Sequence, residues 1–229
     1  MRAPLSIIIP TLNAADALQR SLPALTEGVK AGLVRELVIS DGGSTDATER
    51  VSGEAGAVWV SGPAGRGGQL RRGVEAAEGE WLLILHADTV LGDGWSESVL
   101  DHMPHPENAA YFRLRFDVNG VAPQLVAGWA NMRSRLFSLP YGDQGLLISA
   151  TLYHGIGGYP DIPLMEDVAI AKALKGKLVQ LPVSATTGSD KYLHEGWFRR
   201  GARNLTTLVR FLLRVSPERL AQNYDRRSR

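Results

Sequence analysis

Short apolar runs alternate with helical patterns over the first 90 residues, and this alternation constrains the fold more than any other feature. A strand, a helix and a second strand in this order form a right-handed unit whose strands lie parallel in one sheet. The run at 81–86 is apolar up to its last residue, as expected of a strand covered on both faces. We therefore predict an α/β fold with strands at 5–9, 36–40, 57–61 and 81–86, and with helices that begin near residues 13 and 44 and end near residue 77.

The first predicted helix carries one apolar stripe and one conflict. Pro23 lies inside the stripe, so we expect a kink or a division of the helix into two pieces. Asn13 precedes the helix and is a residue type that caps helix starts. The stripe recurs at intervals of three and four residues and is expected to be buried: Leu18, Leu22, Leu25 and Val29.

The pattern after residue 93 is mixed rather than purely alternating. Strands are predicted at 111–116 and 145–150, and helices at 125–139 and 165–174. No long linker separates the two halves, which predicts one domain at 1–197. We expect a nucleotide-binding half at about 1–92, an acceptor half at about 93–197, and a basic helical extension of the same domain at 198–229.

Composition excludes several classes of protein. A formal net charge of +1 argues against a nucleic-acid binder that relies on a global positive field, so no nucleic-acid partner is expected. The absence of cysteine excludes thiolate catalysis and Cys-based metal sites. No apolar run approaches the roughly 18 residues of a membrane-spanning helix. We expect a cytoplasmic protein without a signal peptide, with the inner face of the membrane as a second location.

Three polar loops follow predicted strands, at the carboxyl ends where open α/β sheets bind their ligands. Asp41 stands where an acid accepts hydrogen bonds from a ribose or a base edge, and the glycines after it permit close backbone approach. A tight turn capped by Ser44 or Asp46 explains the same residues. Asp88 can hold either a hard cation or a ribose. The loops are Pro10-Thr11-Leu12-Asn13, Asp41-Gly42-Gly43-Ser44-Thr45-Asp46 and His86-Ala87-Asp88.

Three further stretches allow two interpretations each. The glycine- and arginine-rich stretch at 65–73 can grip a diphosphate or simply start a solvated helix. Glu166 and Asp167 can act in catalysis or only favour the dipole of the helix that they begin. The loop at 141–145 can line a pocket or form a turn. The motifs of dinucleotide-binding dehydrogenases, P-loop nucleotidases, serine hydrolases and zinc proteases do not occur in the sequence.

Taken together, the three loops, the glycine-rich stretch and the Glu166-Asp167 pair resemble the motifs of family-two glycosyltransferases of the GT-A fold, in order and approximate spacing, from residue 5 to about 175. The chain looks most like a compact bacterial branch catalogued as radical-SAM/selenodomain-associated transferases. The resemblance implies a Rossmann-like, mostly parallel sheet flanked by helices, with a C-terminal helical extension. It also implies inverting transfer of a sugar from a nucleotide-diphosphate sugar, with a UDP-sugar as the first candidate, to an acceptor hydroxyl.

The resemblance implies roles position by position. Asp88 would hold Mg²⁺ or Mn²⁺ against the diphosphate, and Asp167, beside Glu166, would be the general base. Asp143 and Gln144 would lie on the acceptor side. The nucleotide and its phosphates would contact Pro10, Thr11, Asn13, Asp41, Gly42, Gly43, Arg66, Gly67, Arg71, His86 and Ala87.

The sequence departs from the family pattern at two positions. His86 stands where relatives have an acid two residues before the metal ligand, so we expect Asp88 to hold the metal with diphosphate oxygens and waters. Asp190-Lys191-Tyr192 stands where relatives tend to have a basic pair followed by an aromatic residue. His194 can reach the metal or serve a structural role.

Two other functions remain open at this stage. A nucleotidyltransferase that makes sugar nucleotides would share the fold, but it usually begins with a glycine-rich basic loop, which residues 10–13 do not form. A catalytically inactive nucleotide-sugar-binding module would not need the acids Asp88, Glu166 and Asp167.

The segment after residue 198 has nine arginines and two acids. Its helix at 204–215 either packs on its own domain or lies on an anionic membrane and meets a lipid-linked acceptor. We thus expect a nucleotide-sugar donor, an acceptor that the sequence does not identify, and a peripheral membrane contact through 199–229 as one option. The apolar side of the helix carries Leu205, Leu208, Val209, Leu212 and Leu213, and its other side carries Arg203, Arg210 and Arg214.

Overall fold

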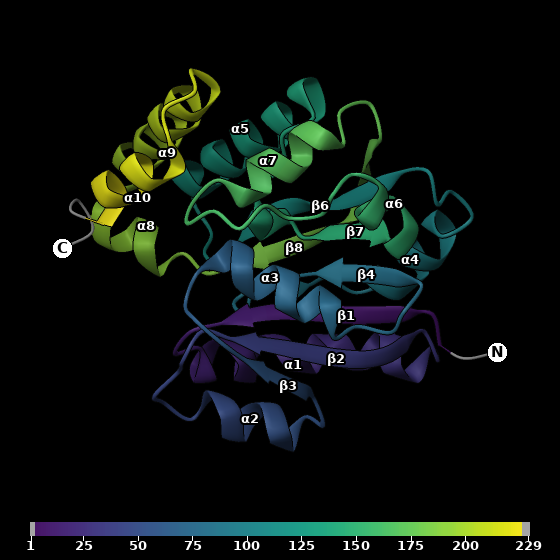
Figure 1. Ribbon diagram of the computed structural model, residues 1–229. Coiled ribbons are helices and arrows are strands. Elements are labelled where there is room, and N and C mark those ends of the chain that lie inside the picture. The colour runs from purple at the N-terminus through teal and green to yellow at the C-terminus, as the bar shows by residue number, and fades with distance from the viewer. Residues whose placement is uncertain (1–2, 226–229) are drawn as a thin grey trace.

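The computed structural model describes residues 3–225, and within that range the strands form one eight-stranded sheet between helices (Figure 1). The strand order is β3-β2-β1-β4-β7-β6-β8-β5. The strands are β1 (Leu5–Thr11), β2 (Val34–Asp41), β3 (Val58–Ser61), β4 (Trp81–Ile84), β5 (Val90–Leu91), β6 (Ala109–Phe116), β7 (Leu146–Ser149) and β8 (Leu178–Thr187).

The first half of the sheet is parallel, as predicted. β1 pairs with β2 and β4, and β2 pairs with β3, all in parallel. Residues Thr11 and Asp41 are register partners, so the loops after β1 and β2 start side by side. The second half is mixed: β7 is antiparallel to β4 and β6, β8 is parallel to β6, and β5 is antiparallel to β8. The predicted α/β class is therefore confirmed.

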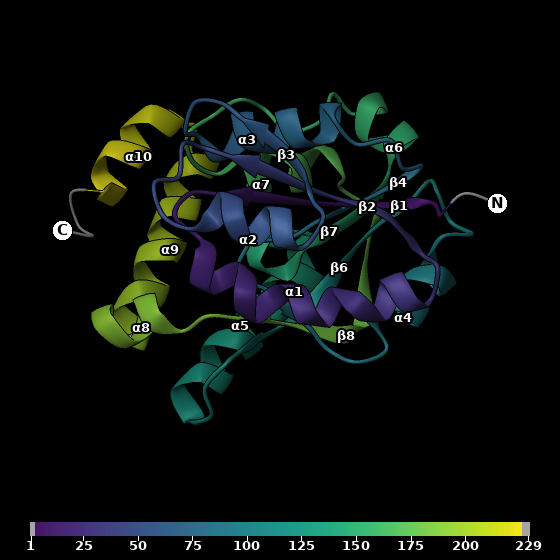
Figure 2. The same cartoon turned by 90° about the horizontal axis from the view of Figure 1, so that it is seen from below.

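Helices cover both faces of the sheet. Figure 2 shows α1 and α4 on one face and α3 and α6 on the other. The side chains of β1 alternate accordingly, because Ile7 and Ile9 join the core under α1 and Ile8 joins the core under α3. The helices of this first group are α1 (Ala15–Lys30), α2 (Thr48–Glu54), α3 (Arg66–Glu75), α4 (Trp95–His102) and α6 (Ala150–Gly155).

The remaining helices lie beside the second half of the sheet, and the last three of them form the C-terminal part of the chain (Figure 1). Helix α9 follows α8 and packs against both α5 and α10. Arg226, Arg227 and Arg229 of the predicted basic extension lie outside the described residues. No helix between residues 3 and 225 is long and apolar enough to cross a bilayer. The elements are α5 (Val121–Phe137), the 3₁₀ helix η1 (Gly142–Gln144), α7 (Glu166–Ala173), α8 (Asp190–Glu195), α9 (Trp197–Leu212) and α10 (Pro217–Asp225).

The structure tests three details predicted for α1. The helix runs unbroken past Pro23, which excludes the predicted division into two pieces. The prediction that Asn13 caps the helix is wrong: its side chain accepts a hydrogen bond from Thr45 N instead, and Asp46 accepts one from Ala15 N, the first residue of α1. Val29 is exposed, so the buried stripe ends one turn before the end of the helix.

Candidate functional site

The loops after β1 and β2 meet at the carboxyl end of the sheet and are hydrogen-bonded together. Gly42 N donates to Thr11 O over 2.9 Å, and Asn13 N donates to Ser44 Oγ over 2.8 Å. Asn13 adopts a positive φ of 50°, which turns its side chain towards Thr45 N. The convergence expected of parallel neighbouring strands is present in the structure, and Pro10, the last residue before Thr11, lies on this edge in β1.

Asp41 organises this edge. Its side chain is 2% exposed. Oδ1 accepts hydrogen bonds from Thr11 Oγ1 at 2.8 Å and Ser44 Oγ at 2.5 Å, and Oδ2 accepts from Gly43 N and Ser44 N, both at 2.7 Å. Burial acts to raise the pKa of Asp41, but these hydrogen bonds outweigh it and lower the pKa below its usual value. The carboxylate is thus ionised. Its four hydrogen bonds occupy the positions at which its two oxygens can accept.

Gln69 joins the glycine-rich stretch to the same edge. Its Nε2 donates to Thr11 O at 2.6 Å and Ser40 O at 3.1 Å, and its Oε1 accepts from Gly65 N at 3.2 Å. A Cβ on Gly42 would lie 3.0 Å from the Gln69 side chain, which explains the glycine there. Gln69 was not predicted as a site residue. The signal for it was a polar side chain on the face of α3 that packs against the sheet.

Arg66 and Arg72 point to the site, whereas Arg71 does not reach Asp41. Arg66 begins α3 and forms an ion pair with Glu166 at 3.6 Å. Arg72 Nη2 donates to Asp41 O at 3.3 Å. Arg71 is exposed, and its charge acts on Tyr153 of α6 instead. Arg72, and not the predicted Arg71, contacts the Asp41 backbone, because neighbouring helix positions differ by about 100° in direction.

Gly67 is required for packing. A Cβ at this position would lie 2.3 Å from Pro160 O and 2.9 Å from Ile162 N. The loop before α7 therefore lies directly against the first turn of α3, and a side chain at position 67 would push the two apart.

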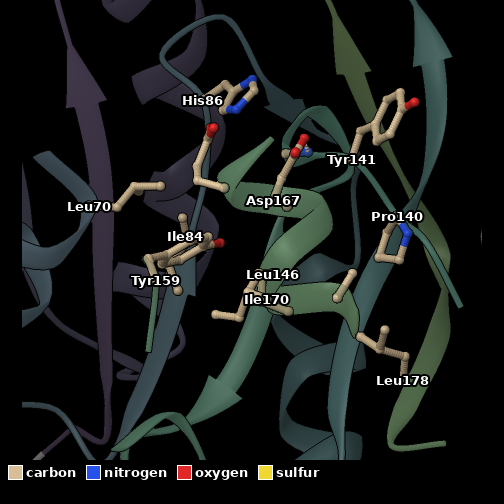
Figure 3. Close-up of a pocket in the computed structure, with 14 residues that line it drawn as sticks. Leu70, Ile84, His86, Pro140, Tyr141, Leu146, Tyr159, Asp167, Ile170 and Leu178 are labelled. Carbon is tan, nitrogen blue, oxygen red and sulfur yellow. Dashed lines mark hydrogen bonds between the residues drawn. The ribbon is translucent and has the colours of Figure 1, made fainter. Parts of the chain in front are cut away.

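His86 and Asp88 follow β4 on the same side of the sheet. A Cβ on Gly142 would lie 2.3 Å from His86 Nε2, so the imidazole rests against the loop at 141–145 (Figure 3). Burial, followed by the charges of Arg66 and Lys191, lowers the pKa of His86 well below its usual value, and the ring is neutral. Ala87 O accepts a hydrogen bond from Ser21 Oγ at 2.7 Å, which fixes this turn.

The carboxylate of Asp88 is half-buried and only weakly bonded within the protein. Its Oδ2 accepts one long hydrogen bond, from Thr187 Oγ1 at 3.5 Å. Among the described residues, no group of three or more His, Cys, Asp or Glu side chains could hold a metal ion. One carboxylate with free acceptor positions nevertheless fits Mg²⁺ or Mn²⁺ when substrate phosphates and waters complete the coordination. His194 is exposed in the last turn of α8.

Lys191 belongs to the same charged cluster and was not predicted as a site residue. Burial and then Arg66 and Arg200 lower its pKa, while Asp88 opposes this effect. Lys191 thus lies within electrostatic reach of both Arg66 and Asp88, although α8 is more than 100 residues further along the chain than either. Only the packing of α8 brings its charge to this position.

The acids at the start of α7 differ in environment. Asp167 Oδ2 accepts from Gly142 N at 2.9 Å, and its Oδ1 accepts from Val168 N at 2.7 Å. Glu166 is 2% exposed, and its Oε1 has no hydrogen-bond partner beyond the ion pair with Arg66. Burial, and then repulsion by Asp167, raises the pKa of Glu166 to about 7. Figure 3 shows Asp167 in one pocket with His86 and Tyr141.

Besides Glu166 Oε1, three more buried polar atoms in or beside this pocket have no hydrogen-bond partner: Arg133 Nη2, Tyr141 OH and Asp143 Oδ1. The guanidinium of Arg133 lies 3.5 Å from the centre of the Tyr141 ring. Burial raises the pKa of Asp143 to about 6, an effect that Arg133 partly offsets and that Asp167 and Asp88 reinforce. Arg133 was not predicted, since only the packing of α5 brings it to the loop at 141–145.

Gln144 does not face the pocket. Its side chain is 0% exposed and is bonded within the protein, with Ser134 Oγ donating to its Oε1 at 2.6 Å and its Nε2 donating to Phe112 O at 3.2 Å. In the structure Gln144 anchors the loop that carries Tyr141 and Asp143, and these contacts do not support the predicted acceptor-side role.

Solved structures share this architecture and define its class. The mannosyltransferase PcManGT from Pyrobaculum calidifontis, in complex with GDP-Man and Mn²⁺, matches with a TM-score of 0.68 and 18% identity over 94% of this chain and 66% of that chain. S. aureus TarS 1-349 matches with a TM-score of 0.63 and 17% identity over 90% of this chain and 64% of that chain. These likenesses show that the fold is GT-A-like, with C-terminal helices.

The sequence match is more specific than the fold. Residues 6–153 match the model of glycosyl transferase family 2, and the chain belongs to this family. A PGL/p-HBAD biosynthesis glycosyltransferase of Mycobacterium bovis is 39% identical over 99 residues, which are 40% of this chain. That match spans only 38% of the relative's length.

Proposed function

We propose that this chain is an inverting glycosyltransferase that moves a sugar from a nucleotide-diphosphate sugar, first of all a UDP-sugar, to an acceptor hydroxyl. The ion pair between Arg66 and Glu166 carries the proposal, because it joins the start of α3 to the start of α7. The groups suited to bind a diphosphate and the acid suited to act as a base therefore surround one site. TarS has been solved with UDP-GlcNAc, and PcManGT with GDP-Man.

On the donor side, the edge formed by Pro10, Thr11, Asn13 and Asp41 receives the nucleotide in this proposal. Asp41 holds Gly43 and the loop around it in place, since its carboxylate is already saturated by protein donors. Arg66 and Lys191 supply positive charge for the diphosphate. Residues 1–92 thus act as the nucleotide-binding half and 93–197 as the acceptor half, with 198–229 as an extension of the same domain.

Asp88 is the residue that would hold Mg²⁺ or Mn²⁺. Such an ion, when bound, neutralises charge on the departing diphosphate. The neutral imidazole of His86 adds no competing positive charge beside Asp88.

Asp167 acts as the general base in the proposed reaction. Its carboxylate takes the proton of the acceptor hydroxyl while the hydroxyl oxygen forms a bond to the anomeric carbon. The bond from that carbon to the diphosphate oxygen breaks on the opposite face, and the nucleoside diphosphate leaves with the bonding electrons, so the configuration inverts. The hydrogen bond from Gly142 N holds the carboxylate in place. The partnerless atoms of Arg133, Tyr141 and Asp143 then meet the acceptor.

The two other functions lose support from the site. Residues 10–11 end β1 and hydrogen-bond to neighbouring loops, and they do not form the glycine-rich basic loop of sugar-nucleotide synthesis. A binding module would gain nothing from the partnerless buried groups on the acceptor side. The relation to the compact radical-SAM/selenodomain-associated branch is part of the proposal and rests on the order of the motifs.

A thermal-shift titration tests the donor assignment. A UDP-sugar should raise the unfolding temperature, and Mn²⁺ should increase the effect; at a hundredfold excess over Kd the stabilisation is about 2.7 kcal/mol. Asp88→Asn should lose the Mn²⁺-dependent part, whereas Asp101→Asn, an exposed acid of α4, should behave as the wild type. If no diphosphate sugar stabilises the protein, or if Asp88→Asn responds to Mn²⁺ unchanged, the assignment is wrong. Stabilisation by a nucleoside triphosphate alone would favour nucleotidyl transfer.

A further inference from the structure

Helix α5 has large apolar side chains on its outer face. They recur at intervals of three and four residues and so form one stripe along the helix. The inner face consists of small or polar residues: Pro123, Ala127, Ala130, Arg133 and Ser134. This is the reverse of the pattern expected of a surface helix. The outer stripe contains Val121, Leu125, Trp129, Met132 and Leu136, of which Val121 is 75% and Leu136 is 68% exposed.

Helix α9 repeats this arrangement. Its outer stripe again follows helical spacing, while the side chains that it buries are Arg200, Thr207 and Leu208. The stripe contains Phe198, Leu205, Val209 and Leu212, all exposed. The arrangement in both helices calls for a common explanation, because each large apolar residue would be more favourable buried inside the protein than exposed.

The two stripes belong to neighbouring helices. Helices α5 and α9 pack against each other and lie side by side in both views (Figures 1 and 2). We call the nine residues of the two stripes the α5–α9 surface. Large exposed apolar side chains elsewhere among residues 3–225 are mostly scattered over separate elements, such as Val29 in α1 and Leu100 in α4. Large exposed apolar residues that gather on two neighbouring helices are typical of an interaction surface.

Charge identifies what covers the surface. Neither α5 nor α9 contains an Asp or Glu. Of their six arginines, Arg133 bonds to Leu139 O, and Arg200 and Arg203 form ion pairs with Glu195 of α8, so the basic flanks of the surface come from the other three. Arg135 and Arg199 are exposed, Arg210 is half-buried, and Arg214 is exposed just after α9. An anionic lipid surface matches an apolar face with basic flanks. A second copy of this chain docked by the same face would bring these arginines together, which is unfavourable.

We propose that the α5–α9 surface docks this protein on an anionic membrane. The docked face lies beside the acceptor side, because α5 carries Arg133 next to Tyr141. The docking proposal rests on the α5–α9 surface and does not depend on the proposed function. A second step, which rests on the proposed function, is that the acceptor is anchored in the membrane and offers its hydroxyl group at the interface.

Vesicle co-sedimentation of the full chain tests the docking, with vesicles of pure phosphatidylcholine or of equal parts phosphatidylcholine and phosphatidylglycerol. The wild type should bind the anionic vesicles, and added salt should weaken the binding. Leu125→Gln/Trp129→Gln in α5 and Leu205→Gln/Val209→Gln in α9 should each lower the partition coefficient by at least about tenfold. Glutamine is a good helix former, so the unfolding temperature should not fall. Val29→Gln/Leu100→Gln, which changes exposed apolar residues elsewhere, should bind as the wild type does.

Arg135→Gln and Arg210→Gln should each reduce binding to the anionic vesicles by about fivefold and leave binding to pure phosphatidylcholine unchanged. The proposal is overturned if the wild type does not bind anionic vesicles, or if the α5 and α9 variants bind as tightly as the control. It is also overturned if sedimentation velocity shows a dimer that the same variants convert to a monomer. None of these measurements needs a sugar donor, so their failure leaves the proposed glycosyl transfer untouched.

Discussion

The two sides of the site are prepared in opposite ways. On the donor side, the carboxylate of Asp41 accepts four hydrogen bonds, and the side chain of Gln69 joins β1, β2 and the start of α3 through three more. On the acceptor side, Arg133, Tyr141 and Glu166 each keep a buried polar atom without a hydrogen-bond partner. The carboxylate of Asp41 is fully bonded before any ligand arrives, although Ser40 Oγ and Arg72 Nε beside it are buried without a partner, and the acceptor side leaves more of its polar atoms unbonded.

The difference indicates where binding energy is held. A buried polar group without a partner destabilises a protein by about 1 to 3 kcal/mol, and a ligand that supplies the missing hydrogen bond recovers part of this. An acceptor whose hydroxyl groups bond to these atoms therefore gains binding free energy. At the donor edge around Asp41, where the carboxylate is already bonded, the fit of the ligand's shape matters more. The pKa values show the same contrast. The pKa of Asp41 is lower than its ordinary value, whereas the pKa values of Glu166 and Asp143 are raised above theirs.

The largest expected effect is the loss of the proposed base. Asp167→Asn keeps an oxygen that can accept the hydrogen bond from Gly142 N, but it cannot take a proton from the acceptor. We expect kcat to fall by about 10²- to 10⁴-fold. Donor-induced stabilisation in the thermal-shift titration should stay within error of the wild type, because the donor side is separate. Asp101→Asn serves as the control, and turnover by Asp167→Asn within about tenfold of the wild type would place the base elsewhere.

The next effect is a pH dependence of opposite sign on the two sides. The pKa of Glu166 is raised from 4.5 to about 7, so between these values the folded protein holds a proton that the unfolded chain has released. Its contribution to stability therefore falls as the pH rises through this window, by about 3 kcal/mol in all. Glu166→Gln removes the titrating group, and urea unfolding should show the variant gaining stability relative to the wild type between about pH 5 and about pH 8.

Asp41 gives the matched comparison. Its pKa is lowered from 3.8, so its contribution is present above that value and is lost as the pH falls towards acid. Asp41→Asn should thus be less stable than the wild type at neutral pH, and the deficit should shrink only in acid. Parallel pH profiles for Glu166→Gln and Asp41→Asn would contradict the contrast between the two sides.

The sequence predicts the donor side well because its signals are local. Apolar runs place β1, β2 and β4, and parallel pairing then requires that Asp41 and Asp88 follow strands that end at one edge. β8 was missed because Pro182 and the polar residues around it interrupt its apolar pattern. It nonetheless supplies Thr187, which donates a hydrogen bond to Asp88.

The acceptor side and the charged cluster are less predictable because they depend on how helices pack. Arg133 reaches Tyr141 only because the inner face of α5 is made of small residues that let the helix lie close to the sheet. The periodicity of α5 identifies a helix, but not that its larger apolar residues face outwards. Lys191 and Arg72 likewise depend on the rotation of α8 and α3, which spacing along the chain does not determine.

The smallest expected effect is a difference in stability between two variants, each of which lacks one hydroxyl group on one side of the site. Thr11→Val removes the group that donates to Asp41 over 2.8 Å and leaves a buried carboxylate oxygen short of a partner. The free energy of unfolding should fall by about 1 to 2 kcal/mol. Tyr141→Phe removes a buried hydroxyl that has no partner, so the free energy of unfolding should stay the same or rise by up to about 1 kcal/mol.

Urea unfolding of both variants at one neutral pH measures this difference, and neither change alters charge or much volume. Equal losses would mean that the Tyr141 hydroxyl is already bonded in the free protein, and the acceptor side would then be as complete as the donor side. A loss in Thr11→Val alone would show that the Tyr141 hydroxyl is unbonded in the free protein and does not stabilise it. The presence of this hydroxyl would then be explained by a ligand that bonds to it.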